Sequence, residues 1–232
     1  MTAVVPPLRT RTLPLSVECL TRTEDGEQLH ALLWSAGPGW RMISSTVLGG
    51  GIAERAWVLN AQVSHGYRRT DPAQHLTELA RDARAQGEGV GMLTAADVTA
   101  HTHGYDAGAA AVVTAGIGVR GWAASPSEGT SRAPAPGTIN IIAALPVPLT
   151  DAALVNAVAT ATEAKVQALL DAGYDCSGTP TDAVCIAARR PHPEAETHAF
   201  AGPRSLWGAR LARAVHHAVH TALPSPGATS PD

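Results

Sequence analysis

The feature that most limits the fold is one long helical segment, LTDAALVNAVATATEAKVQALLDAG, at residues 149–173. At about 100° per residue, its larger apolar side chains form one stripe, made of Leu154, Val155, Val158, Val166, Leu169 and Leu170. Asn156 and Glu163 lie on the border of this stripe or opposite it, whereas Lys165 projects into it. Thr150 is placed to cap the first turn. We therefore expect this helix to pack against a core with an ammonium group directed inward.

Strand-like and helix-like patterns alternate along the rest of the chain. Apolar runs predict strands at residues 30–36, 40–50, 53–63, 89–95, 109–118, 137–147 and 181–188. Further helices are predicted at residues 71–87, weakly at 95–108, and at 202–223, and GGGIAE at 49–54 is typical of a hairpin-like turn. This order favours a mixed α/β (α+β) fold in which helices pack on a layered sheet. It leaves the topology of the sheet open.

Domain organisation follows from the position of the clearest loop. SPSEGTSRAPAPG, at residues 125–137, is rich in Ser, Gly and Pro. We predict a single domain over residues 1–222, with two structural halves meeting near 125–137 as the alternative. Residues 223–232 have the composition of a disordered tail.

Composition and charge exclude several classes of protein. The formal net charge is -3 and there is no basic block, which argues against a nucleic-acid partner because phosphate binding needs clustered Lys and Arg. No segment approaches the roughly 20 apolar residues of a membrane helix, and the first residues lack the pattern of a signal peptide. With three cysteines in no framework spacing, we expect a cytoplasmic protein. A homo-oligomer is compatible with the sequence.

The common catalytic motifs are absent. The chain has no G-x-x-x-x-G-K-[ST] loop, no G-x-S-x-G elbow and no H-E-x-x-H pair. His216 and His220 have the i, i+4 spacing that places two ligands on one helix face, but a surface helix explains them better. We therefore predict no metal site.

Small polar residues instead gather where predicted strands begin or end. They are Thr94 and Asp97 in MLTAAD, Thr138 and Asn140 in PGTIN, and Thr179, Thr181 and Asp182 in SGTPTDA. Such junctions hold functional groups on loops fixed by a rigid sheet, although Thr and Asp also close turns and cap helices. Together with Lys165 and Glu163, they predict one polar cluster above the sheet.

These motifs carry a resemblance to a known family. VLNAQVSHGYRRTDP, GVGMLTAADV, GTINI, ALVNAVATATEAKVQALLDAG, SGTPTDAVCIAA and FAGPRSLWGARLARAV follow one another in this order. From about Ser44 to about Val219, the chain resembles the CbiZ family of adenosylcobinamide amidohydrolases. The family pattern more usually has Thr where this chain has Ser177, which keeps the hydroxyl.

The resemblance implies a reaction. Family members hydrolyse the amide between a propionyl side chain of the corrin ring and aminopropanol in adenosylcobinamide, which yields adenosylcobyric acid for corrinoid salvage. The corrinoid is the substrate, so no cofactor is expected. The alternatives are a corrinoid-binding protein without hydrolysis, an amidohydrolase for a different acyl-amine, and a zinc hydrolase that uses the histidines.

Candidate roles follow from what amide hydrolysis requires. Lys165 is a general base or a cation facing the oxyanion, with Asp182 as its carboxylate neighbour. Thr181 or Thr179 is the nucleophile or a donor beside an activated water. Glu163 lies roughly 160° around the helix from Lys165, so we prefer Lys165. The expected substrate-binding residues are Asn60, Thr94, Asp97, Thr138, Asn140 and Asn156, with Asn60 and Asn140 as amide donors.

Overall fold

The computed structural model describes residues 15–125 and 137–224, which form three α-helices, one 3₁₀ helix and ten strands. The strands are β1 (Glu18–Glu24), β2 (Glu27–Trp34), β3 (Trp40–Ser44), β4 (Gly51–Glu54), β5 (Trp57–Gln62), β6 (Gly89–Thr94), β7 (Thr102–Asp106), β8 (Ala109–Gly116), β9 (Thr138–Pro148) and β10 (Ala183–Arg189). The helices are α1 (Pro72–Asp82), α2 (Asp151–Asp171) and α3 (Leu206–Ala222), and the 3₁₀ helix is η1 (Val98–Ala100). The predicted mixed class, with helices packed on sheets, is confirmed.

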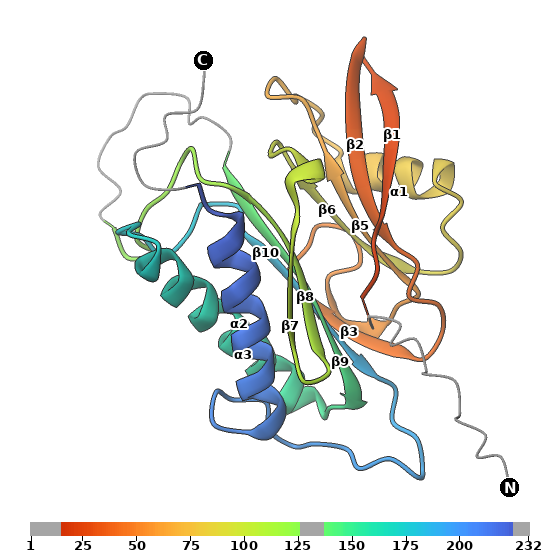
Figure 1. Ribbon diagram of the computed structural model, residues 1–232. Coiled ribbons are helices and arrows are strands. Elements are labelled where there is room, and N and C mark those ends of the chain that lie inside the picture. Colours follow the sequence, from red (N-terminus) through yellow and green to blue (C-terminus); the bar gives the residue numbers. More distant parts are fainter. Residues whose placement is uncertain (1–14, 126–136, 225–232) are drawn as a thin grey trace, which may run out of the picture.

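The elements stack in four layers (Figure 1). Helices α2 and α3 cover one face of a six-stranded sheet of order β4-β3-β10-β9-β8-β7. The other face of that sheet packs on a four-stranded sheet of order β1-β2-β5-β6, and α1 covers the outer face of this second sheet. Three hydrophobic cores therefore separate the layers, one at each interface.

Each sheet contains one parallel pair of strands joined through a helix. β5 pairs with β6 across α1, and β9 pairs with β10 across α2. Parallel neighbours need such a crossover because a short turn cannot return the chain to the same end of the sheet. All other strand pairs are antiparallel.

Strand β9 divides its side chains between two cores. Ile139 and Ile141 face α2 and α3, whereas Ile142 belongs to the core between the sheets. Because side chains alternate along a strand, Thr138 and Asn140 share the direction of Ile142. The interface between the two sheets thus becomes polar where β9 begins.

The buried face of α2 differs from the predicted stripe. Val155 and Leu170 are 58% and 47% exposed, although both were expected to face the core. The buried residues are Ala153, Leu154, Ala157, Thr160, Ala161, Ala164, Lys165, Ala168 and Leu169. Alanines let α2 approach β10 and α3 closely, so the small residues decide which face is buried. The predictions that Lys165 faces inward and that Thr150 caps the helix are confirmed.

The structure differs from the sequence-based expectation at three other places. Residues 51–54 form the strand β4, not a turn, because they pair with β3. The weak helix expected at 95–108 is wrong, since η1 is followed by β7, which pairs with β8. Gly104 in β7 lies against the backbone of α3, where a Cβ would collide with the Ala214 carbonyl. Strand β1 was not predicted at all.

Two predicted regions lie largely outside the described residues. The loop expected at 125–137 and the tail at 223–232 overlap the described part only at its edges. Among the helices of residues 15–125 and 137–224, none combines the length and apolar character needed to span a membrane.

Candidate active site

The inward-facing lysine of α2 meets a carboxylate. The ammonium group of Lys165 donates a hydrogen bond to Oδ2 of Asp182, which lies just before β10. Both partners of this ion pair are nearly buried, with side chains 9% and 11% exposed. Because a charge is costly to bury without a partner, Asp182 explains why this face of α2 tolerates a lysine.

Asp182 is held by four donors in all. Its Oδ1 accepts a hydrogen bond from the backbone N–H of Ile139 at 2.9 Å and one from the Thr179 hydroxyl at 2.6 Å. Its Oδ2 accepts from the backbone N–H of Thr179 at 3.2 Å, in addition to Lys165. These contacts fix the carboxylate and join the start of β9 to the turn before β10.

Gly178 makes room for this ion pair. Its φ is +146°, and a Cβ at this position would lie less than 3.0 Å from both Asp182 Oδ2 and Lys165 Nζ. Any other residue would also be strained by the backbone conformation. The glycine in SGTPTD is therefore a direct requirement of the buried charges.

Threonine hydroxyls continue from Asp182 toward the surface. The Gly137 carbonyl oxygen lies 2.8 Å from Oγ1 of Thr179 and 3.1 Å from Oγ1 of Thr181. Oγ1 of Thr181 also lies 2.6 Å from Oγ1 of Thr138. Each hydroxyl has one proton, and hydrogen bonds to a carboxylate are the stronger ones. Thr179 then donates to Asp182, Thr181 to Gly137 and Thr138 to Thr181. Among the described residues, none then donates to the oxygen of Thr138, which can accept a hydrogen bond from a ligand.

Two buried amides lie behind these hydroxyls, between the sheets. Asn140 Nδ2 donates to Asn60 Oδ1 at 2.8 Å and to the Leu93 carbonyl at 3.1 Å, and Asn60 Nδ2 donates to the Thr114 hydroxyl at 2.9 Å. Oδ1 of Asn140 is buried without a partner among the described residues. The pair therefore ties β9 to β5 and β8.

A cavity of about 530 Å³ opens at the polar end of the two sheets. Thr94, Thr138, Thr181 and Asp182 line it, together with segments that follow β3 and β5. The structure thus brings together four of the predicted site residues from three separate motifs. Neither Lys165 nor Thr179 lines the cavity, and both lie behind Asp182.

Several predicted site residues lie elsewhere. Asn60 and Asn140 are each 1% exposed and support the wall through Leu93 without lining the cavity. Glu163 lies on the exposed face of α2. Asp97 caps η1 by accepting from the Thr99 backbone N–H at 2.9 Å, and Asn156 accepts from the Ala201 backbone N–H at 3.3 Å near the other end of α2.

The cavity also contains residues that the sequence did not suggest. Ser45 and Thr46 follow β3, and Ser64, His65 and Tyr67 follow β5. The sequence pattern that could have identified them is the one used for the predicted residues, namely polar side chains just after an apolar strand. It occurs here in the stretches SST and SHGY. Both strands run toward the cavity, which the sequence does not reveal.

The histidines form no recognisable metal centre. Within residues 15–125 and 137–224, no three His, Cys, Asp or Glu side chains come together as metal ligands. His216 contacts Asp171, with Nε2 2.8 Å from Oδ2, and its ring stacks on that of His220 at a centroid distance of 6.0 Å. The hydrogen bond with His216 lowers the pKa of the Asp171 carboxyl group.

The family relationship follows from a comparison over nearly the whole chain. The protein-family model described as adenosylcobinamide amidohydrolase, CbiZ, matches residues 16–231. The chain belongs to the CbiZ family. Every residue of the cavity lies within the matched CbiZ region.

Individual relatives agree with the family match. The chain is 33% identical over 185 residues to an adenosylcobinamide amidohydrolase of Methanosarcina mazei, which covers 77% of this chain and 88% of the relative. It is 45% identical over 102 residues to a protein of the same name from Halobacterium salinarum, covering 44% and 42% of the two chains. A crystal structure of the PH0078 protein from Pyrococcus horikoshii OT3 is similar with a TM-score of 0.49 and 13% identity, over 95% of this chain and 88% of that one.

Proposed function

We propose that the chain hydrolyses the amide of adenosylcobinamide that joins a corrin propionyl side chain to aminopropanol. The products are adenosylcobyric acid and 1-aminopropan-2-ol. CbiZ membership and the names of two relatives support this reaction. The observation that carries the proposal is that MLTAAD, GTINI and SGTPTD, far apart in the sequence, place Thr94, Thr138, Thr181 and Asp182 around one cavity.

The size and polarity of the cavity suit the side-chain arm of the substrate. A volume of about 530 Å³ falls in the range of small-molecule sites, and the hydroxyls can bind both the amide and the alcohol of aminopropanol. The corrin ring then stays at the mouth of the cavity. Val47, which lines the cavity and is 60% exposed, offers it an apolar contact.

Among the hydroxyls proposed as nucleophile, Thr181 is the better placed. Thr181 lines the cavity, whereas Thr179 is occupied behind it with Asp182 and Gly137. We assign the Thr181 hydroxyl to direct contact with the scissile amide, beside Thr138. Lys165 then acts as a positioning residue, because it fixes Asp182 and, through it, the turn that carries Thr181.

The direct test is turnover. Purified protein is incubated with adenosylcobinamide in the dark, with and without EDTA, and adenosylcobyric acid and aminopropanol are followed by mass spectrometry. Product in both tubes is the expected result, and it would also remove a labile metal from the mechanism. A corrinoid that co-elutes with the protein but stays intact would make the chain a corrinoid-binding protein. Release of another amine from a substrate panel would point to a different acyl-amine.

Two substitutions at one position test the assignment of Thr181. Thr181→Val keeps the shape and removes the hydroxyl, and we expect kcat to fall by about 10²-fold or more. Thr181→Ser keeps the hydroxyl and should retain most of the activity. Equal activity in the Val and Ser variants would remove Thr181 from the reaction.

We also propose that the reaction takes place in the cytoplasm. The three cysteines support this location, because Cys19, Cys176 and Cys185 are all free thiols and disulfides are rare in reducing compartments. Fractionation of cells that produce the tagged full chain tests the proposal, which recovery outside the cytoplasmic fraction would contradict.

A further inference from the structure

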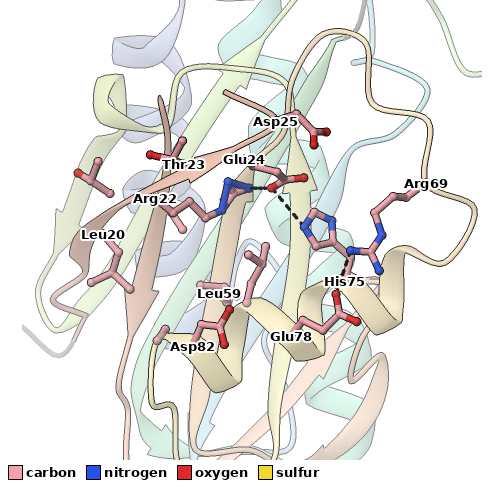
Figure 2. Close-up of a pocket in the computed structure, with 14 residues that line it drawn as sticks. Leu20, Arg22, Thr23, Glu24, Asp25, Leu59, Arg69, His75, Glu78 and Asp82 are labelled. Atoms are coloured by element: carbon pink, nitrogen blue, oxygen red, sulfur yellow. Dashed lines mark hydrogen bonds and ion pairs between the residues drawn. The ribbon is translucent and has the colours of Figure 1, made fainter. Parts of the chain in front are cut away.

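A second cavity lies beside the first, on the outer side of the four-stranded sheet. It has a volume of about 700 Å³ and lies between β1 and α1 (Figure 2). His75 of α1 projects into it and meets Glu24 of β1, with His75 Nε2 3.3 Å from Glu24 Oε2. Arg22 reaches the same oxygen of Glu24 at 3.0 Å. The carboxylate is thus held between a guanidinium and an imidazole.

His75 connects this second cavity with the candidate active site. Its other ring nitrogen, Nδ1, lies 3.1 Å from the hydroxyl of Tyr67, and the two rings stack at a centroid distance of 5.6 Å. Tyr67 lines the 530 Å³ cavity together with Asp182 and Thr181. A continuous path therefore runs from Glu24 through a histidine that is 3% exposed to a phenol in the active-site cavity.

Amide hydrolysis requires an acid, because an amine leaves readily only after its nitrogen has gained a proton. Of the described side chains that line the cavity, three titrate, namely His65, Tyr67 and Asp182. Asp182 is already surrounded by four donors. His65 is exposed, and no described residue orients it by a hydrogen bond or ion pair. Of these three, only Tyr67 contacts a histidine, and that histidine reaches the second cavity.

We propose that Tyr67 donates the proton to the leaving amine and that His75 and Glu24 are positioning residues that return this proton. The proposal rests on the proposed amidohydrolase function. As the tetrahedral intermediate collapses, the C–N bond breaks, its electron pair goes to nitrogen, and nitrogen takes the proton of the Tyr67 hydroxyl. The phenol oxygen then takes a proton from Nδ1 of His75, while Nε2, which faces Glu24, takes a proton from the second cavity. That proton comes from a hydronium ion in the solvent of the second cavity, and it balances the proton released to solvent when the attacking water becomes part of the carboxylate.

The surroundings keep the proton on Tyr67 until it is needed. Partial burial raises the pKa of the Tyr67 phenol above its usual range, and the carboxylates of Asp71, Glu24 and Glu78 act in the same direction, against Arg69. Tyr67 is therefore protonated at neutral pH, as a proton donor must be.

The test compares two leaving groups on the same acyl group. Tyr67→Phe keeps the ring and its stacking on His75 but removes the hydroxyl. With adenosylcobinamide, we expect kcat to fall by about 10²-fold or more. With a nitrophenyl ester of adenosylcobyric acid, whose leaving group needs no proton, we expect kcat to fall by less than about threefold, since no general acid is required. Equal losses on both substrates, or unchanged cleavage of the amide, would overturn the role of Tyr67.

Two variants of His75 separate proton return from simple anchoring of α1. In His75→Asn the side-chain amide remains near the Nδ1 position, beside Tyr67, whereas in His75→Gln it lies near the Nε2 position, beside Glu24. Both should be folded, with thermal unfolding as the check, and both should lose turnover of the amide while they still cleave the ester. A variant that keeps full turnover of the amide would remove His75 from the path.

The outcome for the wild-type protein separates the proposed amidohydrolase function from the proposed role of Tyr67. Wild type that leaves adenosylcobinamide intact would overturn the amidohydrolase function and the role of Tyr67 with it. Turnover by the wild type together with unchanged Tyr67→Phe kinetics would overturn the role of Tyr67 alone. A mutant His65→Gln that loses the amide reaction and keeps the ester reaction, beside an active Tyr67→Phe, would assign the acid to His65.

Discussion

Removing the ammonium group from the buried ion pair should destabilise the fold by a measurable amount. Lys165→Met keeps the length of the side chain and leaves Asp182, 11% exposed, without its cation. Breaking a buried pair in this way costs about 3–5 kcal/mol. Asp182 retains three other donors, so we expect the low end, about 3 kcal/mol. For a chain of this size, this corresponds to a melting temperature lower by about 6–12 °C.

The measurement is urea and thermal unfolding followed by circular dichroism, with two further variants. Glu163→Gln removes a charge from the exposed face of the same helix and should change stability by less than about 0.5 kcal/mol. Asp182→Asn combined with Lys165→Met removes both charges and should recover part of the loss. In the amidohydrolase assay, Lys165→Met should lower kcat by about 10²-fold, because the turn that carries Thr181 loses its anchor.

One result would refute this reasoning. If Lys165→Met were as stable as the wild type and the double variant no more stable than Lys165→Met, the two charges would not be coupled. Lys165 would then be a lysine whose stem covers apolar surface while its head reaches water, and the inward direction of the side chain would have no role in the site.

Three further results are expected. Gly178→Ala should destabilise the protein by about 1–3 kcal/mol in urea unfolding, because a Cβ there meets the buried ion pair at a strained φ. Asn60→Leu should cost about 1–3 kcal/mol, since it removes one hydrogen-bond partner from each of two buried polar neighbours, Thr114 and Asn140. Burial raises the pKa of the Cys185 thiol to about 12 from 9.0, so this thiol favours folding below pH 9 and that contribution is lost as pH rises from 9 to 12. Exposed Cys19 should therefore react with a thiol reagent in the native protein while Cys185 does so only after unfolding, as labelling with mass spectrometry can check.

Local pattern was sufficient for the elements with the strongest periodicity. The helix at 151–171, its Thr150 cap and the strands β9 and β10 appear close to where they were predicted. Patterns weighted by large apolar residues misplaced the buried face of α2, since small alanines permit the closer approach. The sequence around residue 104 weakly predicted a helix. The segment is a strand because it pairs with β8 and packs against α3. Tertiary contacts override weak local preference at such positions.

In the candidate site too, local pattern predicted the placement of some residues and not of others. Polar residues before β9 and β10 could be predicted as a group, because parallel neighbours place their starting ends at one edge of the sheet. Asp97 belonged to a similar pattern at a strand end, and Asn156 and Glu163 belonged to the helix that carries Lys165, yet a cap, a loop contact and the exposed helix face account for their positions. Local pattern alone does not distinguish these two outcomes.

The sequence by itself determined which residue types lie at the ends of the strands and that the lysine of α2 faces inward. It also determined the family to which the chain is similar. The sequence also suggested Asp182 as the carboxylate neighbour of Lys165, and the structure shows their contact. Only the tertiary structure decided that the two sheets stack so that β5 and β9 share a polar end, and that Tyr67 contacts His75. The physical reason is that local pattern follows the geometry of a single element, whereas these contacts depend on register and layer stacking between elements that are far apart in the chain.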